Sequence, residues 1–273
     1  MGDGMAFDEV NARGLVLVGA GRMGGAMLRG WLAGGLNPGA VTVIDPQPGE
    51  WLFQLGVEIN RAPPVNPAVV VIAVKPQMMG DALGEVARAI GPETLVISIA
   101  AGVRIARFEE VLPPCAIVRS MPNTPAAIGK GITALIGNAR AGEGEMALAE
   151  TLLSAVGETV RLASEDQLDA VTGVSGSGPA YVFHLIEALT AAGEAEGLAP
   201  DLALALARAT VAGAGALAMH DDTPPAELRR AVTSPNGTTQ AGLEVLMDEA
   251  TGLRPLIART VAAATARSRE LGQ

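Results

Sequence analysis

The first half of the chain alternates short, continuous apolar runs with segments of helical periodicity. Runs of Val and Ile without polar alternation are typical of strands that are covered on both faces, as in a parallel sheet. The alternation of these runs with helical segments predicts a doubly wound α/β domain. The expected strands are 15–21, 40–46, 68–76, 94–103 and 116–122, and the expected helices between them are 22–34, 77–90 and 104–110.

Two further apolar runs, GITALIG (131–137) and ETVRL (158–162), extend the predicted sheet, with a helix at 142–156 between them. From about residue 164 the Val/Ile-rich runs stop, and the rest of the chain has helical periodicity. The sequence therefore predicts an α/β domain over 1–163, with a flexible tail at 1–13, and an all-helical domain over 164–273. The expected helices of the second domain are 165–172, 179–196, 200–219, 225–232, 238–248 and 251–271.

Composition narrows the classes of function. The chain has 273 residues and a net charge of −10, without a basic run, which argues against nucleic acid or an anionic membrane surface as a partner. The single Cys115 leaves no intrachain disulfide and fits a reducing, cytoplasmic compartment. His184 and His220 are too far apart in sequence for a short metal-binding motif, so no metal is expected.

The stretch 202–219, LALALARATVAGAGALAM, has about the length of a membrane-spanning helix. It is rich in Ala and Gly and contains Arg208, so its transfer into lipid would gain little free energy. A helix that is apolar all round is also typical of a fully buried helix, and this is the interpretation that we prefer.

The motif GAGRMG (19–24) follows the first predicted strand and opens a helix, which is the context of a dinucleotide-binding fingerprint. Gly19 permits the tight turn, Gly21 allows the backbone to approach a pyrophosphate, and Gly24 lets the helix pack on the strand. The free N–H groups of the helix N-terminus favour an anion there. The predicted cofactor-binding residues of this motif are Gly19, Ala20, Gly21, Arg22, Met23 and Gly24.

Asp45 ends the second predicted strand, where an acidic residue can bind the ribose 2′-hydroxyl of NAD and would repel the 2′-phosphate of NADP. It favours NAD only weakly, because Arg22 could accommodate the phosphate. Lys75 and Pro76 end the third strand at the sheet edge where ligands bind in such folds. Lys75 has three possible roles, as a general acid, a phosphate contact or a solvated strand end.

Two loops without charge complete the candidate site. In MPNTP (121–125) two prolines stiffen the loop, and Asn123 offers a donor and acceptors that suit a carboxamide or a water molecule. SGSGPAY (175–181) does not match the G-x-S-x-G motif of hydrolases and has no strand before it, so we interpret it as a helix interruption that permits close backbone approach.

The stretch SPNGTTQAGLEVL (234–246) places a turn directly before an amphipathic helix. Ser234, Thr238 and Thr239 are good N-cap residues, and Asn236 and Gly237 tolerate positive φ. Several N–H and hydroxyl donors therefore converge at a helix N-terminus, which favours a small anion such as a carboxylate. A well-capped helix without a ligand is the alternative interpretation.

Taken together, these motifs resemble Δ1-pyrroline-5-carboxylate reductases. They run in the order of that family and cover nearly the whole chain from residue 14. The resemblance rests on VGAGRMGGAM (18–27), AVKPQ (73–77), VRSMPNTPAAIGKGITAL (118–135), DAVTGVSGSGPAY (169–181) and SPNGTTQAGLEVL (234–246).

The resemblance implies an N-terminal Rossmann domain, a helical domain that interlocks with a second subunit, and NAD(P)H-dependent reduction of the cyclic imine 1-pyrroline-5-carboxylate to L-proline. It implies at least a homodimer, in which the substrate loop comes from the partner subunit. The imine nitrogen would lie near Thr239, and the substrate carboxylate near Ser234, Gly237 and Thr238. The cofactor would lie against Ala73, Val74 and Lys75, with the nicotinamide over Met121, Pro122 and Asn123.

The sequence departs from the family pattern at two positions. Asn236 stands where the family commonly has Gly, and Asp45 stands where many members have a residue suited to the NADP phosphate. The absence of an acid from the substrate loop is consistent with the chemistry, because an iminium forms in solution and the cofactor carries the hydride.

Two other functions are alternatives to the reductase. A β-hydroxyacid dehydrogenase or related keto reductase would need a catalytic lysine in the helical domain, but residues 164–273 contain no lysine. A non-catalytic NAD-sensing or scaffold protein would not oxidise reduced nicotinamide in the presence of the imine.

Overall fold

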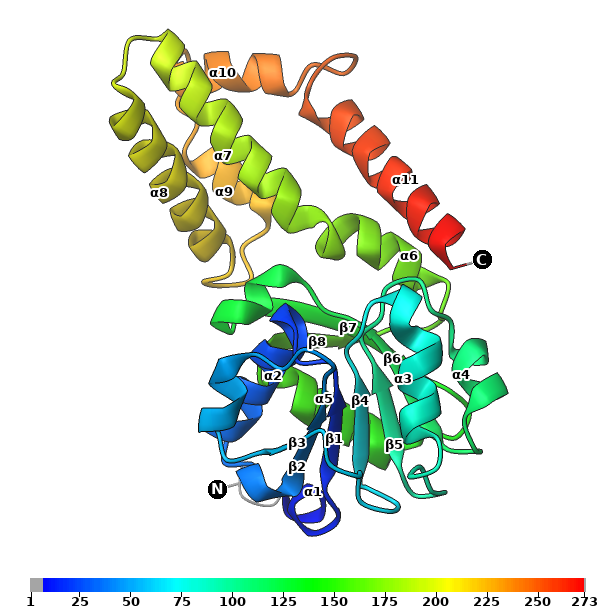
Figure 1. The fold of residues 1–273 in the computed structure, drawn as a ribbon. Coiled ribbons are helices and arrows are strands. Elements are labelled where there is room, and N and C mark those ends of the chain that lie inside the picture. Colours follow the sequence, from blue (N-terminus) through cyan, green and yellow to red (C-terminus); the bar gives the residue numbers. More distant parts are fainter. Residues whose placement is uncertain (1–6, 273) are drawn as a thin grey trace. The chain divides into compact units, whose positions relative to one another are not determined.

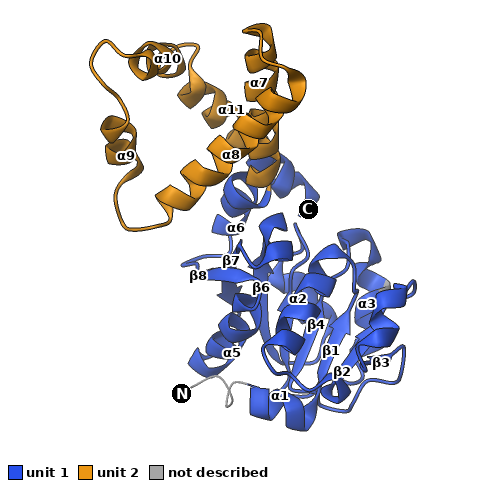
Figure 2. Ribbon diagram, turned by 90° about the vertical axis from the view of Figure 1, so that its left-hand side faces the viewer, with its two compact units in different colours: residues 1–176, 264–273 blue, residues 177–263 orange. Residues whose placement is uncertain are grey.

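The computed structural model of the chain describes residues 7–272, apart from the side chain of Asp81. The chain forms two compact units (Figure 2). One contains residues 1–176 and 264–273, and the other contains residues 177–263. We refer to them as the sheet unit and the helical unit. An α/β domain followed by helices is the fold class expected from the sequence, and it is confirmed.

The sheet unit is built on one eight-stranded sheet with the order β3-β2-β1-β4-β5-β6-β7-β8 (Figure 1). All neighbouring strands are parallel except β6 and β7, which are antiparallel. The strands are β1 (Leu15–Val18), β2 (Val41–Ile44), β3 (Glu58–Ile59), β4 (Val69–Ile72), β5 (Leu95–Ser98), β6 (Ala116–Met121), β7 (Gly131–Gly137) and β8 (Gly157–Arg161).

Helices cover both faces of this sheet, so successive residues of a strand enter different cores. Leu15 and Leu17 of β1 belong to the core beneath α2 and α5, whereas Val16 and Val18 belong to the core beneath α3 and α4 (Figure 1). All four residues of β1 are buried, which explains the continuous apolar run. The helices are α2 (Arg22–Ala33), α3 (Met79–Val86), α4 (Ile105–Val111) and α5 (Glu143–Ser154), with short 3₁₀ turns η2 (Pro38–Ala40), η3 (Glu50–Gln54), η4 (Pro76–Met78) and η5 (Thr124–Ile128).

The start of the described chain corrects one expectation. The predicted flexible tail included residues 7–13, but Asp8–Arg13 form helix α1, in which Val10 is fully buried. Val10 enters the same core as Leu15 and Trp31, so burial of apolar side chains holds this segment on the sheet unit. Residues 1–6 lie outside the described residues.

The sheet unit extends beyond the boundary that the sequence predicts between residues 163 and 164. Glu165 accepts hydrogen bonds from the buried Arg119 of β6, at 2.7 Å, and from the N–H of Ile105, at 2.8 Å. Helix α6 (Gln167–Val171) and the π-helical turn η6 (Thr172–Gly176) follow. Near the other end of the chain, the Ser268 hydroxyl donates to the buried carboxylate of Asp169 at 2.7 Å. These contacts explain why 164–176 and 264–273 belong to the sheet unit.

The helical unit contains α7 (Gly178–Ala195), α8 (Pro200–Ala218), α9 (Pro225–Ala231), α10 (Thr238–Leu246) and the first part of α11 (Leu253–Leu271). Helices α7, α8 and α9 each have a proline at the start. The backbone N–H groups of a first helical turn have no acceptor within the helix, so a proline, which lacks this N–H, loses no hydrogen bond there. Gly193 of α7 leaves room for Leu198 and Ala203, since an added Cβ would lie 3.2 Å and 3.3 Å from their side chains.

Helix α8 is long and apolar enough to cross a membrane by length and composition, with a mean hydropathy of 1.4. The sequence favoured burial of this helix. In the single chain, however, Ala203 and Ala207 are its buried residues, while Leu202 and Leu206 are each half exposed. The described residues of a single chain therefore leave the apolar side chains of α8 partly exposed to solvent, although an apolar helix of this kind is expected to be buried.

Candidate active site

The glycine motif forms a tight turn between β1 and α2. Gly19 has φ +91°, a conformation that favours glycine, and its N–H donates to the carbonyl of Ile44 at 2.8 Å. A Cβ at Gly24 would overlap the carbonyl oxygen of Gly19, whereas a Cβ at Gly21 would meet no atom within 4 Å. Gly24 is thus required by packing, and Gly21 leaves open space above the turn. This geometry fits the backbone approach of a pyrophosphate.

Asp45 fastens this turn to the end of β2. Its carboxylate accepts the N–H of Ala20 at 2.7 Å and the N–H of Gln47 at 2.8 Å. The side chain of Asn60 holds the backbone of Asp45 through two further bonds of 2.9 Å. A carboxylate has about four acceptor positions, so two remain for another donor such as a ribose hydroxyl.

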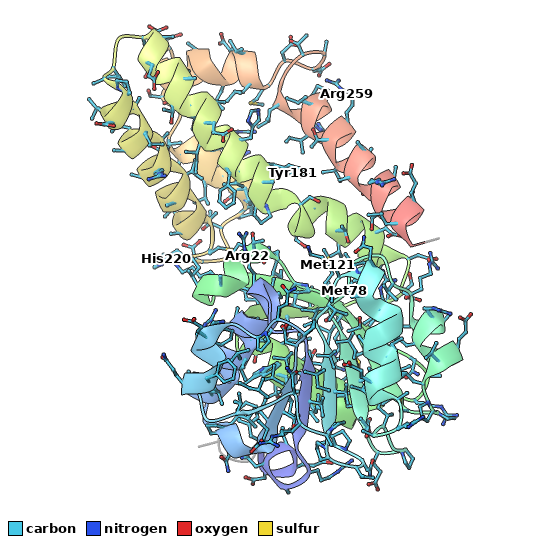
Figure 3. All side chains as sticks on the ribbon, viewed as in Figure 1. Arg22, Met78, Met121, Tyr181, His220 and Arg259 are labelled. Atoms are coloured by element: carbon cyan, nitrogen blue, oxygen red, sulfur yellow. The ribbon has the colours of Figure 1, made fainter. Side chains whose placement is uncertain are left out.

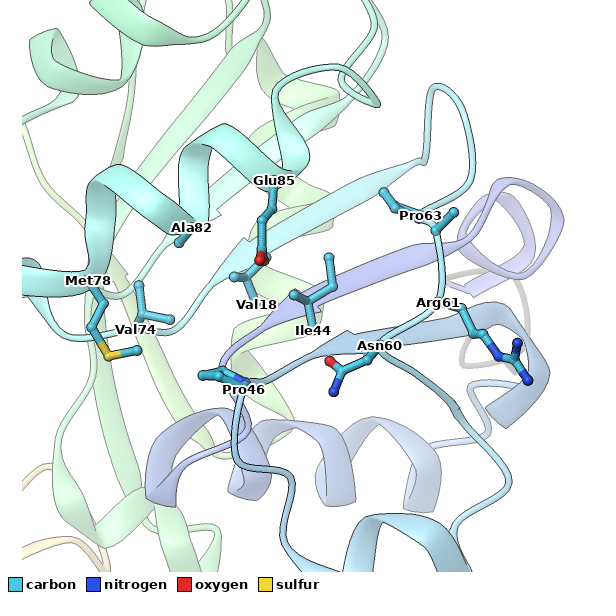
Figure 4. Close-up of a pocket in the computed structure, with 11 residues that line it drawn as sticks. Val18, Ile44, Pro46, Asn60, Arg61, Pro63, Val74, Met78, Ala82 and Glu85 are labelled. Atoms are coloured by element: carbon cyan, nitrogen blue, oxygen red, sulfur yellow. The ribbon is translucent and has the colours of Figure 1, made fainter.

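A cavity of about 760 Å³ opens at the carboxyl ends of β1, β2 and β4 (Figure 4). This is the point at which the strand order reverses on either side of β1, where ligands bind in open parallel sheets. The volume is in the range of ligand pockets. The lining residues are Val18, Ile44, Pro46, Asn60, Arg61, Ala62, Pro63, Val74, Met78, Ala82 and Glu85.

Asn60 and Arg61 are residues of this cavity that the sequence analysis missed. They follow β3, a two-residue strand too short to show a pattern, and Asn60 has φ +51°. Arg61 also lines the cavity, but its exposed side chain points away from the other lining residues (Figure 4), with its Nε 3.7 Å from the carboxylate of Glu58. The only signal in the sequence was Asn60 itself, because Asn tolerates positive φ and so indicates a turn after the strand.

The segment after β4 lies beside the glycine turn. Ala73 donates its N–H to the carbonyl of Val18 at 2.8 Å, and a Cβ at Gly19 would lie 2.7 Å from the Ala73 oxygen. Val74 lines the cavity, while Lys75 is exposed immediately before Pro76, which opens η4. The structure therefore brings together the predicted cofactor residues of the first, second and fourth strands.

The loop after β6 is held by the side chain of Asn123. Its Nδ2 donates to the carbonyl of Ser175 at 3.2 Å, and its Oδ1 accepts the N–H of Ile132 at 3.0 Å. Asn123 is buried, so these bonds make it chiefly an anchor between this loop, β7 and η6. One N–H and one acceptor position of the Asn123 amide remain for a ligand, so its expected contact with a carboxamide or a water molecule stays a prediction.

The helix interruption expected at SGSGPAY is confirmed as the π-helical turn η6. A Cβ at Gly176 would lie 2.6 Å from the Cε of Met121, which is labelled in Figure 3. Gly176 therefore lets η6 pack closely against the end of β6. Single π-helical turns are frequent at functional sites.

The loop 234–239 lies in the helical unit, before α10. Gly237 is the N-cap of α10, and its own N–H donates to the carbonyl of Ser234 at 3.1 Å. Thr238 and Thr239 occupy the first helical turn, where N–H groups have no intrahelical acceptor, and their side chains are exposed. The Gly237 amide, expected as a donor to the substrate carboxylate, thus donates within the loop. The amides and hydroxyls of the two threonines remain as donors for a ligand.

Two further observations concern metal ligands and the cysteine. Among residues 7–272 no group of three or more His, Cys, Asp or Glu side chains is placed to hold a metal ion. Cys115 lies outside the regions described above and is buried, and its burial raises the pKa of the thiol to about 11.

Comparison with known proteins assigns the family. The helical region matches the model "Pyrroline-5-carboxylate reductase dimerisation" over residues 165–271, and residues 14–102 match "NADP oxidoreductase coenzyme F420-dependent". A pyrroline-5-carboxylate reductase of Pseudomonas aeruginosa is 41% identical over 267 residues, which cover 95% of this chain and 97% of that protein. The chain belongs to the pyrroline-5-carboxylate reductase family. A reductase of Methanosarcina acetivorans is 37% identical over 94% of this chain and 97% of that protein.

Solved structures of pyrroline-5-carboxylate reductases share the fold. That of Coxiella burnetii has a TM-score of 0.89 and 35% identity, and it is matched over 96% of this chain and 99% of its own. That of Plasmodium falciparum, described with NADP bound, has a TM-score of 0.81 and 27% identity, with the same coverage. Membership of this reductase family makes the protein an NAD(P)-dependent oxidoreductase that acts on a C=N bond.

Proposed function

We propose that this pyrroline-5-carboxylate reductase reduces 1-pyrroline-5-carboxylate to L-proline, the last step of proline biosynthesis, with NADH or NADPH. The observation that carries the proposal is the loop 234–239, in which uncharged donors gather at the N-terminus of α10. This set of donors suits an amino-acid carboxylate, because a helix N-terminus favours an anion and its first N–H groups have no acceptor within the helix.

Each residue of the loop has a proposed role. The carboxylate takes the amide N–H groups of Thr238 and Thr239 together with the hydroxyls of Ser234 and Thr238. Asn236 and Gly237 shape the turn, and a Cβ at Gly237 would displace the Ser234 hydroxyl, from which it would lie 2.4 Å away. The Thr239 hydroxyl holds the ring nitrogen, and we assign Thr239 as the catalytic residue.

The reaction needs little acid–base work from the chain. Reduced nicotinamide supplies a hydride to the C=N carbon when it is bound. The substrate enters as an iminium, so the nitrogen keeps its proton and receives the electron pair of the C=N bond. The chain holds the ring by its carboxylate and nitrogen, and positioning of this kind can contribute about 7–11 kcal/mol to rate enhancement.

The cofactor is proposed to occupy the sheet unit, with its pyrophosphate at residues 19–24 and its adenosine end at the cavity beside Asp45. The negative charge of Asp45 favours NADH, because a 2′-phosphate would be repelled. Arg22, the first residue of α2, offers a compensating positive charge, so NADPH is accepted as a weaker cofactor. Ala73, Val74, Lys75 and Pro76 flank the cofactor, with Met121, Pro122 and Asn123 under the nicotinamide.

The protein is proposed to work as a homodimer at least, in the cytoplasm. Apolar side chains of the helical unit support this assembly, because many are about half exposed in the single chain. The examples with the largest exposed fractions on α7, α8 and α10 are Phe183, Leu202, Leu206, Leu217, Val245 and Leu246. In the assembled dimer the loop 234–239 of one subunit would meet the nicotinamide of its partner.

The test of the function is direct. The protein is mixed with 1-pyrroline-5-carboxylate and NADH or NADPH, and the absorbance of the reduced nicotinamide is followed. Oxidation with either cofactor is expected, and its absence with both would favour a protein that only binds NAD. In Thr239→Ala, turnover should fall by about ten- to a hundredfold while cofactor affinity stays within about twofold. Equal loss of both would contradict the role given to Thr239.

The cofactor preference has its own experiment. Asp45→Asn removes the negative charge but keeps the shape of the side chain, and the ratio of kcat/KM for NADH to that for NADPH is measured. We expect this ratio to fall by about tenfold. The ratio cancels any loosening of the glycine turn that affects both cofactors alike. An unchanged ratio would assign the preference to another residue.

A further inference from the structure

Asn236 holds a backbone conformation that is costly for most residues. Its φ is +57°, in the left-handed region. Asn tolerates this region better than other residues with a Cβ, but glycine adopts it more readily. A contact that favours this conformation over the alternatives would therefore stabilise the turn before α10.

Gln240 supplies such a contact. Its Oε1 accepts the N–H of Asn236 at 2.8 Å. Its Nε2 donates to the carboxylate of Glu244, one helical turn further on, at 3.1 Å. The second bond fixes which end of the amide faces Asn236, because only Nε2 can donate to a carboxylate. Gln240 is partly buried and lies on α10, so the turn is fastened to the helix that follows it.

The bond also determines which donors remain available. The N–H of Asn236 is used by Gln240, and the N–H of Gly237 is used by Ser234. The amides left at the helix N-terminus are those of Thr238, Thr239 and Gln240, which have no intrahelical acceptor. A turn held in one conformation presents these amides and the Ser234 hydroxyl in fixed directions.

We propose that Gln240 is a positioning residue for the substrate carboxylate, acting through Asn236. The inference rests on the proposed function, since the loop is taken as the site of 1-pyrroline-5-carboxylate. Gln240 offsets the presence of Asn, rather than Gly, at position 236. It does not touch the reacting atoms, so it affects how well the substrate is bound more than how fast it is reduced.

A double-mutant cycle tests this inference. Gln240→Leu removes the acceptor but keeps the size and the helix propensity of the side chain. We expect the KM for 1-pyrroline-5-carboxylate to rise by about fivefold, with kcat and the KM for the cofactor within twofold. Asn236→Gly alone supplies the second single-mutant reference of the cycle. Asn236→Gly combined with Gln240→Leu should return the KM to within about twofold of the original, because glycine adopts positive φ unaided.

Amide hydrogen exchange of the segment 234–240 gives a readout without substrate. Gln240→Leu should speed exchange there, and Gln54→Leu, on the exposed turn η3 of the sheet unit, is the matched control that should not. The inference is overturned if Gln240→Leu changes neither exchange nor KM, if both KM values rise together, or if Asn236→Gly gives no rescue. Failure of the proposed function would look different: the unmodified protein would show no oxidation of reduced nicotinamide, whereas its exchange would still respond to Gln240→Leu.

Discussion

The sheet unit and the helical unit differ in how much of their apolar surface one chain can cover. In the sheet unit, Leu15, Val69 and Val96 are completely buried between helices on both faces. In the helical unit, Phe183 is 59% exposed and Leu202 and Leu206 are 50% exposed. The strands of the sheet unit are therefore covered within one chain, although side chains outside them such as Phe53 are exposed, whereas the apolar helices of the helical unit lack such cover.

The largest effect is expected where the helical unit lacks cover. Phe183→Asp places a charge where we propose that a second subunit packs, which should weaken the dimer by at least about a hundredfold and abolish most activity. Phe53→Asp is the matched control, because Phe53 in the sheet unit is 66% exposed and should tolerate the charge. Light scattering after gel filtration measures the mass of each variant. A dimer that survives Phe183→Asp unchanged would contradict the comparison.

The second prediction separates packing from ligand approach within the sheet unit. Gly24→Ala forces a Cβ against the backbone of Gly19 and should destabilise the unit by about 1–3 kcal/mol. Gly21→Ala meets open space, so its melting temperature should stay within about 2 °C, while the KM for the cofactor rises about tenfold or more. Thermal unfolding and steady-state kinetics measure the two quantities. Equal melting temperatures for both variants would refute the distinction.

Much of this fold could be predicted from the sequence because its signals are local. The continuous Val/Ile runs gave seven of the strands, with ends that differ from the structure by a few residues, and every predicted helix exists. Strand β3 was missed because two residues carry no periodicity. Helix α1 was missed because Val10 and Phe7 are isolated apolar residues, whose burial depends on a core formed by distant segments.

The glycine turn of the candidate site was predictable because one residue type carries its geometry. Gly19 and Gly24 are such residues, since a Cβ at either would collide with backbone. Asn60, Arg61 and Gln240 were not found, because their roles depend on which atoms lie next to them in the folded chain. For the same reason the sequence could not tell that both ends of the Asn123 amide are already bonded.

The third prediction concerns this buried amide. Asn123→Asp replaces the Nδ2 donor with an oxygen that faces the carbonyl of Ser175, so it should destabilise the sheet unit by about 1–3 kcal/mol. Asn37→Asp is the matched control, because Asn37 is exposed and its side-chain oxygen accepts the N–H of Gly39, which Asp can also do. Chemical denaturation gives both free energies of unfolding. Similar losses in both variants would argue against the anchoring role of Asn123.

The last prediction concerns the burial of Cys115 in the sheet unit, where the expected change in folding stability is the smallest. Cys115 is the only cysteine of the chain, so thiol chemistry reports on this unit alone. Burial raises its pKa to about 11, so at pH 8 the thiolate is scarce and reagents must wait for the core to open. We expect a chromogenic disulfide to label the native protein at least about a hundredfold more slowly than the guanidinium-unfolded chain. Because the folded state holds the proton more tightly, stability should fall slightly as pH rises from about 9 towards 11. Rapid labelling of the native protein at pH 8 would show that the core around Cys115 is open. The contrast between a well-buried sheet unit and a partly exposed helical unit would then be contradicted, because the sheet unit would not be well buried.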